Sequence, residues 1–182
     1  NMLYYRRKIL LALLQTFGGR LSAIQMQKYL FLVARQQSEK AYHFIPYKYG
    51  CFSFQANQDM TTLEKYGYIS IKDNDYILND TSTKFIVELD LFDQQFVRNV
   101  FKDFGSLTQN ELITYTYVNY PFFAINSTIA SNILDEEQLE IVNAQRRKKD
   151  ERMLFTIGYE GVSLEEYINK YESNTNNISL YR

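Results

Sequence analysis

The sequence predicts an α+β protein that is mainly helical. Two observations carry this prediction. Apolar residues recur at helical spacing through much of the 182-residue chain, and a short β-hairpin follows the first three predicted helices. A hydrophobic fraction of 46% supplies enough apolar side chains for a packed core, so the length suits one domain together with a piece of another.

The first two predicted helices lie near the N-terminus. Residues 3–17 carry an apolar stripe, and Gly18–Gly19 ends this helix because glycine adopts the left-handed conformation that follows many helices. A second helix begins at Ser22. Ser22 and Gln25 form a capping box, in which two side chains satisfy free backbone N–H groups at the helix start.

A third helix follows an aromatic, β-prone segment at residues 42–53. Ser53 is expected to cap this helix, which runs over about 54–66 and ends at Gly67. Helical spacing predicts an inward face of three apolar side chains: Ala56, Met60 and Leu63. The outward face is expected to carry five polar side chains: Gln55, Gln58, Asp59, Thr62 and Lys65.

A β-hairpin is predicted over residues 68–78, with its turn at Asp73–Asp75. Three helices followed by a hairpin are the element order of a winged helix-turn-helix, in which the third helix is the recognition helix and the hairpin is the wing. We therefore predict a winged-helix-like domain over residues 1–79.

Residues 80–150 predict a helical extension of this domain. Asp80 or Thr81 is expected to begin a long helix over 81–104, which Gly105 ends. Five apolar residues are predicted to line one face of this helix: Phe85, Leu89, Phe92, Phe96 and Val100.

Two further helices complete the predicted extension. Thr108 and Glu111 form a second capping box, and the helix that they begin ends at Pro121. Asp135 is expected to cap a last helix that runs to about Lys149.

The C-terminal residues 151–182 differ in character from the rest. The segment MLFTI predicts a short strand, and Ser163 and Glu166 form a third capping box at the start of another helix. A complete sheet needs more strands than this segment holds, so we expect it to be the truncated start of an α/β domain.

The sequence resembles two known families. The segments MQKYLFLVARQ, YHFIPYKYGCFS and LEKYGYI resemble winged-helix modules of bacteria and archaea, although Cys51 stands where such modules often have proline. The segment LFTIGYEGVSLEEYINK, residues 154–170, resembles the opening of the bacterial family called domain of unknown function 488. Both resemblances imply architecture, and the second implies no established reaction.

Double-stranded DNA is the partner that a winged helix predicts, because this fold places its third helix in the major groove. Three side chains are expected to reach base edges: Gln55, Gln58 and Thr62. Four basic side chains are expected to contact phosphates: Arg20, Lys28, Lys65 and Lys72. Acidic residues on the third helix and at the wing tip reduce the expected affinity: Asp59, Glu64, Asp73 and Asp75.

Charge is unevenly distributed along the chain. The net charge is −1, yet residues 1–50 contain eight basic residues and one acidic residue, a formal charge of +7, so the remainder carries −8. Such asymmetry indicates either a basic face that meets an anionic partner or solvated charges scattered over two helices.

An alternative function is a protein–protein interaction or dimerisation module of a larger protein, with a second copy or another protein as partner. The helix over 81–104 and the aromatic segment over 115–123 would supply the surface, because interfaces are rich in aromatic side chains.

The sequence shows no complete catalytic site, and we predict neither a metal nor a cofactor. Cys51 and His43 are the only cysteine and the only histidine, too few for a zinc site of these ligands, and Cys51 is expected to be buried. The acidic run 135–137 is explained by its place at a helix start. No apolar run approaches the roughly 18 residues of a membrane span, so we expect a cytoplasmic protein with no membrane partner.

Overall fold

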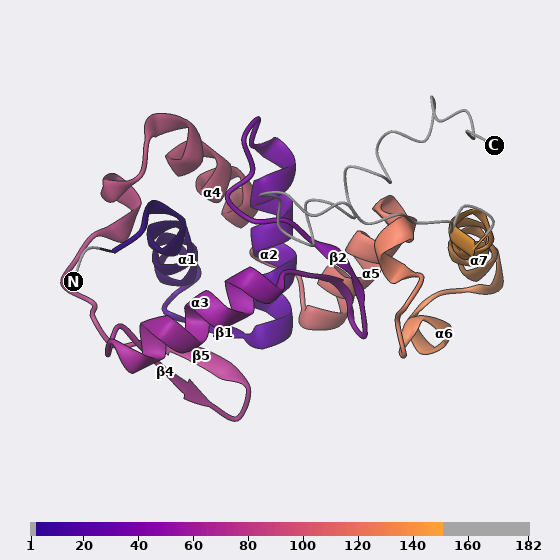
Figure 1. The fold of residues 1–182 in the computed structure, drawn as a ribbon, viewed down its shortest axis with the longest axis horizontal. Coiled ribbons are helices and arrows are strands. Elements are labelled where there is room, and N and C mark those ends of the chain that lie inside the picture. The colour runs from indigo at the N-terminus through magenta and orange to yellow at the C-terminus, as the bar shows by residue number, and fades with distance from the viewer. Residues whose placement is uncertain (1–2, 151–182) are drawn as a thin grey trace, which may run out of the picture.

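A computed structural model describes residues 3–150, with side chains to residue 147. This part of the chain is α+β, as predicted: it contains seven α-helices, two short 3₁₀ helices and two small antiparallel sheets (Figure 1). None of the helices in the described range is long and apolar enough to cross a bilayer. The strand, capping box and α/β start predicted within 151–182 lie outside the described residues.

The first two helices form where the sequence predicts them. α1 (Tyr5–Thr16) ends before Gly18, whose φ of +87° lies in the left-handed region that favours glycine. α2 (Ala23–Gln36) begins after Ser22, and the predicted capping box is confirmed. The Ser22 hydroxyl accepts from the Gln25 N–H, and the Gln25 side chain accepts from the Ser22 N–H.

The segment between the second and third helices forms a β-hairpin. β2 (Ile45–Tyr47) pairs antiparallel with β3 (Gly50–Phe52), and Gly50 has a φ of +90° where the chain turns. α3 (Phe54–Lys65) follows directly. Ser53 caps α3 as predicted, because its hydroxyl accepts a backbone N–H of the first turn.

A three-stranded antiparallel sheet connects distant parts of this region. β4 (Ile69–Lys72) and β5 (Asp75–Leu78) form the predicted hairpin. A third strand, β1 (Arg20–Ser22), pairs with β5 and was not predicted from the sequence. The strand order is therefore β1-β5-β4. The hairpin turn has the type I′ pattern, because Asp73 and Asn74 both have positive φ, 52° and 65°.

The predicted continuous helix over 81–104 is wrong. A 3₁₀ turn, η1 (Phe85–Glu88), comes first, and α4 (Leu91–Phe104) follows it. The Asp90 carboxylate accepts a backbone N–H of the first turn of α4 and so begins this helix. The predicted cap, Asp80, instead closes a local turn. Its carboxylate accepts hydrogen bonds from the backbone N–H groups of Ser82 and Thr83.

This break changes which side of the segment is buried. Phe85, Leu89 and Val100 are buried as predicted, but Phe92 is 77% exposed. The break alters the helical phase, so the buried side of α4 now runs through Val97 and Val100 instead of through Phe92.

The main hydrophobic core surrounds α1. Residues 9–14 in the middle of this helix are fully buried, because α2, α3, η1 and α4 all contact it. α4 lies on one side of α1, and α3 and the three-stranded sheet lie on the other (Figure 1). Core side chains extend from Ile9 to Leu112, so both the predicted domain and the predicted extension contribute to this core.

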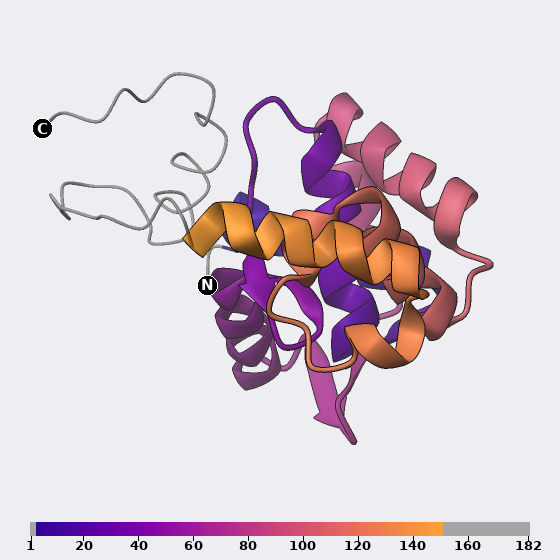
Figure 2. The same ribbon diagram turned by 90° about the vertical axis from the view of Figure 1, so that its right-hand side faces the viewer.

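The last helices form a second, smaller core. α5 (Gln109–Asn119) leads into η2 (Pro121–Ala124), α6 (Ala130–Ile133) and α7 (Glu136–Asp150). The capping box predicted for α5 and the aspartate cap predicted for α7 are both confirmed. α7 contacts η2, and Figure 2 shows it lying across this end of the molecule.

Candidate nucleic-acid interface

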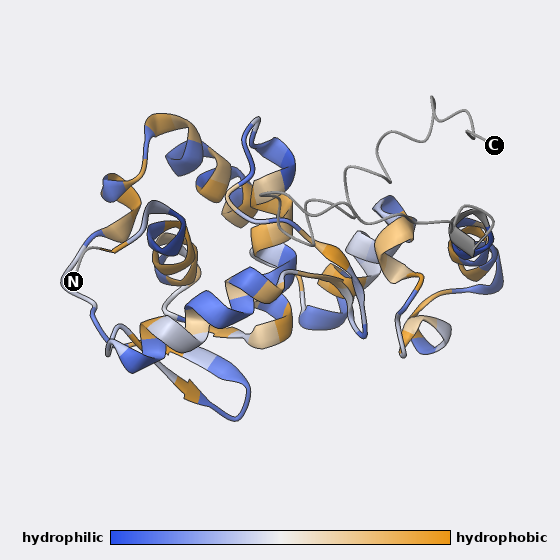
Figure 3. Ribbon diagram, viewed as in Figure 1, coloured by the Kyte–Doolittle hydropathy of each residue, from blue (hydrophilic) through white to orange (hydrophobic). Residues whose placement is uncertain are grey.

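The outer face of α3 carries polar side chains, and Figure 3 shows its ribbon coloured mainly as hydrophilic. Gln55, Gln58 and Lys65 are exposed. Thr62 is half-buried, and its hydroxyl donates to the Gln58 carbonyl oxygen at 3.0 Å. The predicted inward face is confirmed by its three buried side chains, Ala56, Met60 and Leu63.

Asp59 is fully buried, so its predicted place on the outer face is wrong. Asp59 Oδ2 lies 2.6 Å from Arg6 Nε, and Asp59 Oδ1 lies 2.8 Å from Arg7 Nε. The Tyr42 hydroxyl donates to the same carboxylate at 2.9 Å. The prediction failed because a buried carboxylate needs counter-charges, and sequence spacing cannot show that two arginines of α1 supply them. Asp59 therefore holds α3 against α1.

The surrounding groups keep Asp59 charged. Burial alone would raise the pKa of Asp59, but hydrogen bonds from the two arginines and from Tyr42 outweigh burial and hold this pKa below its usual value. Burial, together with the neighbouring carboxylate, raises the pKa of Tyr42, so the hydroxyl keeps its proton and continues to donate. The cluster is therefore a structural support for α3.

A buried glutamine fixes the start of α3. The Gln27 side-chain NH₂ donates to the Ser53 carbonyl oxygen at 3.1 Å, and the Gln27 side-chain oxygen accepts from the Ser53 N–H at 2.8 Å. Both side chains are buried. This pair holds α3 at a defined position on α2. The sequence offers only a weak signal for Gln27, a polar residue next to an apolar run.

The β4–β5 hairpin lies beside α3 and carries one of the predicted phosphate contacts. Lys72 is exposed at the end of β4, next to the exposed turn residue Asp73. Glu64 of α3 accepts a hydrogen bond from the Ile71 N–H at 3.1 Å, which joins α3 to β4. The hairpin therefore has a fixed place relative to the outer face of α3.

Arg20 lies on β1, at the other edge of the sheet, and forms an ion pair. Its Nε and Nη2 atoms lie 2.8 Å and 2.7 Å from Asp75 Oδ2. The Arg20 side chain is 64% exposed, so solvent screens this pair and its contribution to stability is small. Arg20 is thus at the surface, as predicted, with part of its charge neutralised.

Lys28 is buried, and its predicted contact with phosphate is wrong. It is 1% exposed within α2, and its Nζ donates to the carbonyl oxygens of Tyr49 and Cys51 in the β2–β3 hairpin, the second at 3.3 Å. Burial lowers the pKa of Lys28. Lysine is rarely buried completely, so the sequence alone predicts exposure. Its amine instead holds the hairpin against α2.

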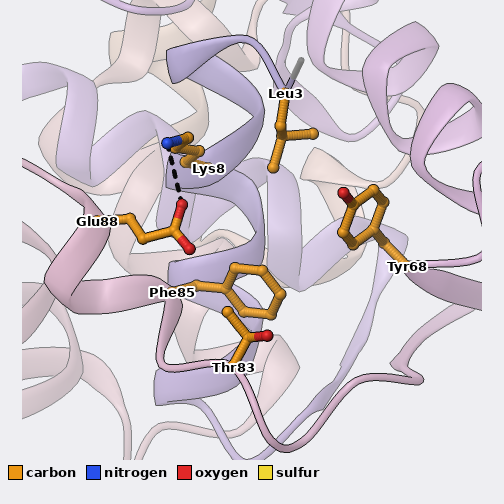
Figure 4. Close-up of a pocket in the computed structure, with 6 residues that line it drawn as sticks. All are labelled: Leu3, Lys8, Tyr68, Thr83, Phe85 and Glu88. Carbon is orange, nitrogen blue, oxygen red and sulfur yellow. Dashed lines mark ion pairs between the residues drawn. The ribbon is translucent and has the colours of Figure 1, made fainter. Parts of the chain in front are cut away.

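A shallow pocket of about 260 Å³ lies on the side of α1 that η1 covers (Figure 4). Phe85, Leu3 and Tyr68 contribute apolar surface, and the Lys8–Glu88 ion pair, with an N–O distance of 3.0 Å, lies at its side. Small-molecule sites usually enclose roughly 300–1,000 Å³. A pocket of this size whose charges neutralise each other is a weaker candidate than the α3 surface.

The described residues contain no group of three or more His, Cys, Asp or Glu side chains placed to hold a metal ion. Cys51 is buried as predicted, and burial raises the pKa of its thiol while Lys28 lowers it. A buried thiol that keeps its proton is a poor nucleophile. Cys51 therefore contributes to packing.

Comparisons with protein-family models, with curated proteins and with solved structures found no match to this chain.

Proposed function

We propose that the chain binds double-stranded DNA through a winged helix-turn-helix formed by α1, β1, α2, α3, β4 and β5. The observation that carries the proposal is the pairing of β1, which precedes α2, with β5 of the hairpin. This pairing attaches the hairpin to the helical core beside α3. In a winged helix the third helix enters the major groove and the hairpin lies near the phosphates.

The outer face of α3 suits contact with bases. Gln55, Gln58 and Thr62 follow one another at spacings of three and four residues, so they lie along one side of the helix. Glutamine can bind adenine through two hydrogen bonds, and threonine can bind several bases. Because Asp59 is buried and paired, it does not oppose DNA on this side.

The positive charge around this face is modest. Lys65 ends α3, Lys72 ends β4 and Arg20 lies on β1, while Glu64 and Asp73 are exposed acidic residues nearby. Few phosphate contacts give weak binding that depends on salt, so we expect micromolar affinity for random-sequence DNA.

Fluorescence anisotropy with random-sequence duplex DNA across a salt series tests this proposal. We expect affinity to fall as salt rises, and Lys65→Glu to weaken binding and to reduce the salt slope by about one phosphate contact. Lys40→Glu is the matched control, because Lys40 is exposed in the loop after α2, outside α3 and the sheet. Absence of binding at low salt, or equal weakening by both variants, would overturn the proposal.

A second variant separates base contacts from phosphate contacts. After selection of a preferred site from a random pool, Gln58→Ala is expected to remove about 1–3 kcal/mol of discrimination at one base pair. The salt slope should stay unchanged, because no charge is removed. Unchanged discrimination at every position would exclude Gln58 as a base contact.

The alternative function, a protein-interaction module of a larger protein, is favoured by one observation. Val87, Leu91 and Phe92 are 62%, 80% and 77% exposed where α4 begins. Large apolar side chains gathered at a surface are typical of interaction sites. The two functions are compatible, since α4 and α3 lie on different sides of α1 (Figure 1).

A further inference from the structure

A patch of exposed apolar side chains lies at the N-terminal end of α4. Its members, which we call the α4 patch, are Tyr5, Val87, Leu91 and Phe92. Tyr5 belongs to this surface because its hydroxyl donates to the carboxylate of Asp90, the cap of α4, at 2.8 Å, and because the residue is 42% exposed. Exposed apolar side chains are unfavourable in water, so burial of the α4 patch against a partner would stabilise the complex.

α4 turns a line of side chains away from the core. The exposed line consists of Leu91, Gln95, Arg98 and Lys102. The opposite, buried side consists of Asp93, Val97 and Val100. The spacing of the exposed line repeats every three or four residues, so these side chains form one continuous surface of the helix.

Charge and polarity change from one end of this line to the other. Asp90 places an exposed carboxylate at the N-terminal end, beside the apolar patch. Arg98 and Lys102 place two exposed cations in the C-terminal half, and exposed Asp103 offsets one of them, so this half keeps a net formal charge of 2 − 1 = +1. Gln95, between the acidic end and the basic half, is uncharged, and its side-chain amide donates to Asn99 at 2.8 Å. A line that is acidic and apolar at one end and basic at the other is complementary to its own reverse.

We propose that two copies of the chain pair through α4, with the helices antiparallel and a two-fold axis near Gln95. In this arrangement Asp90 of each copy faces Arg98 and Lys102 of the other. Leu91 and Phe92 pack on the alkyl part of Arg98 from the second copy, which stays partly hydrated at its guanidinium. Antiparallel pairing also places opposite ends of the helix dipoles together, whereas parallel pairing would bring like charges together.

The second copy leaves the α3 surface accessible. α4 and α3 lie apart in both views (Figures 1 and 2), so the dimer presents two α3 helices away from its interface. The pairing goes beyond DNA binding and does not depend on it.

Sedimentation velocity of the full chain, from low micromolar to submillimolar concentration, measures the pairing. We expect a reversible dimer whose dissociation constant rises about tenfold or more in Phe92→Glu, because a buried charge replaces an apolar contact. Ile141→Glu is the matched control, since Ile141 is 48% exposed on α7. Circular dichroism should show that both variants are folded, because neither side chain is in the core.

A cysteine variant locates the two-fold axis. Gln95→Cys is expected to give a disulfide-linked dimer on oxidation with copper phenanthroline, because the two positions face each other. Ile141→Cys should give none, and the native Cys51 is buried. A chain that stays monomeric throughout, a dimer that Phe92→Glu leaves unchanged, or linkage through position 141 instead of 95 would each overturn the proposal.

Discussion

Arg6 of α1 and Asp59 of α3 form an ion pair with an Nε–Oδ2 distance of 2.6 Å. The Asp59 side chain has no exposed surface, while the Arg6 side chain is 38% exposed. The guanidinium of Arg6 on α1 therefore pairs with a buried carboxylate on α3, the helix that we propose to contact DNA. The position of α3 depends on this contact as well as on apolar packing.

Asp59→Asn is expected to destabilise the fold by about 3 kcal/mol, because it removes one partner of a buried charge cluster and leaves the arginines without their anion. Urea unfolding at neutral pH measures the change. Glu64→Gln is the control on the same helix, since Glu64 is exposed and glutamine keeps the acceptor for the Ile71 N–H. A loss no larger than that of Glu64→Gln would show that the cluster contributes little.

The pH dependence of the Asp59 contribution has a definite sign. The pKa of Asp59 in the folded state is lowered from its usual 3.8, so the unfolded state binds a proton more readily. The contribution of the Asp59 carboxylate to stability is therefore fully present at pH values above this usual pKa and is lost as the pH falls through the folded-state pKa. We expect the stability difference between the wild type and Asp59→Asn to be constant near neutrality and to shrink in acid. A difference that grows in acid would contradict this assignment.

Lys28→Met is expected to lower stability by about 1–3 kcal/mol, because two buried carbonyl oxygens of the β2–β3 hairpin lose their donor. DNA affinity of the folded variant should be unchanged, since the Lys28 amine does not reach the surface. Thermal unfolding and anisotropy together give both quantities. Weaker DNA binding without a change in stability would show instead that Lys28 contacts phosphate.

Gly50→Ala is expected to destabilise the fold more than Gly18→Ala does. Both glycines have positive φ, +90° and +87°, so alanine is strained at either position, at a cost of about 1 kcal/mol. At Gly50 an added Cβ would also lie 2.5 Å from Tyr117 Cε1, whereas at Gly18 nothing lies within 4 Å. Overpacking of this kind costs about 1–3 kcal/mol more. Equal melting temperatures for the two variants would contradict the close packing of the hairpin on α5.

The first three helices and the β4–β5 hairpin could be predicted because their signals are local. The Ser22–Gln25 capping box acts within one turn, and the alternation over 68–78 lies within one hairpin. β1 has no such local signal, because it has only three residues and forms by pairing with the distant strand β5. The start of α4 was predicted at Asp80 or Thr81, but Asp90 caps this helix, and the residues between them include η1, which packs on α1.

For the candidate site, the exposed polar residues of α3 could be predicted from their helical spacing, but the long-range partners of charged side chains could not. Gln55, Gln58 and Lys65 are exposed, as their spacing predicts. Asp59 and Lys28 differ because their partners are distant in the chain: Arg7 is 52 residues from Asp59, and Cys51 is 23 residues from Lys28. Burial of a charged side chain depends on such partners, which spacing alone cannot reveal.

The pairing of β1 with β5 has a consequence for how the protein is made. Arg20 and Asp75, which meet across these strands, are 55 residues apart. Closing so large a loop loses chain entropy before the strands gain their contacts, so this sheet is expected to form late in folding. On the ribosome β1 emerges long before its partner, and its edge stays unpaired until Leu78 has left the exit tunnel. The β4–β5 hairpin and α3 therefore reach their final arrangement together. A nascent chain that has not yet released Leu78 from the tunnel cannot present the proposed DNA-binding surface.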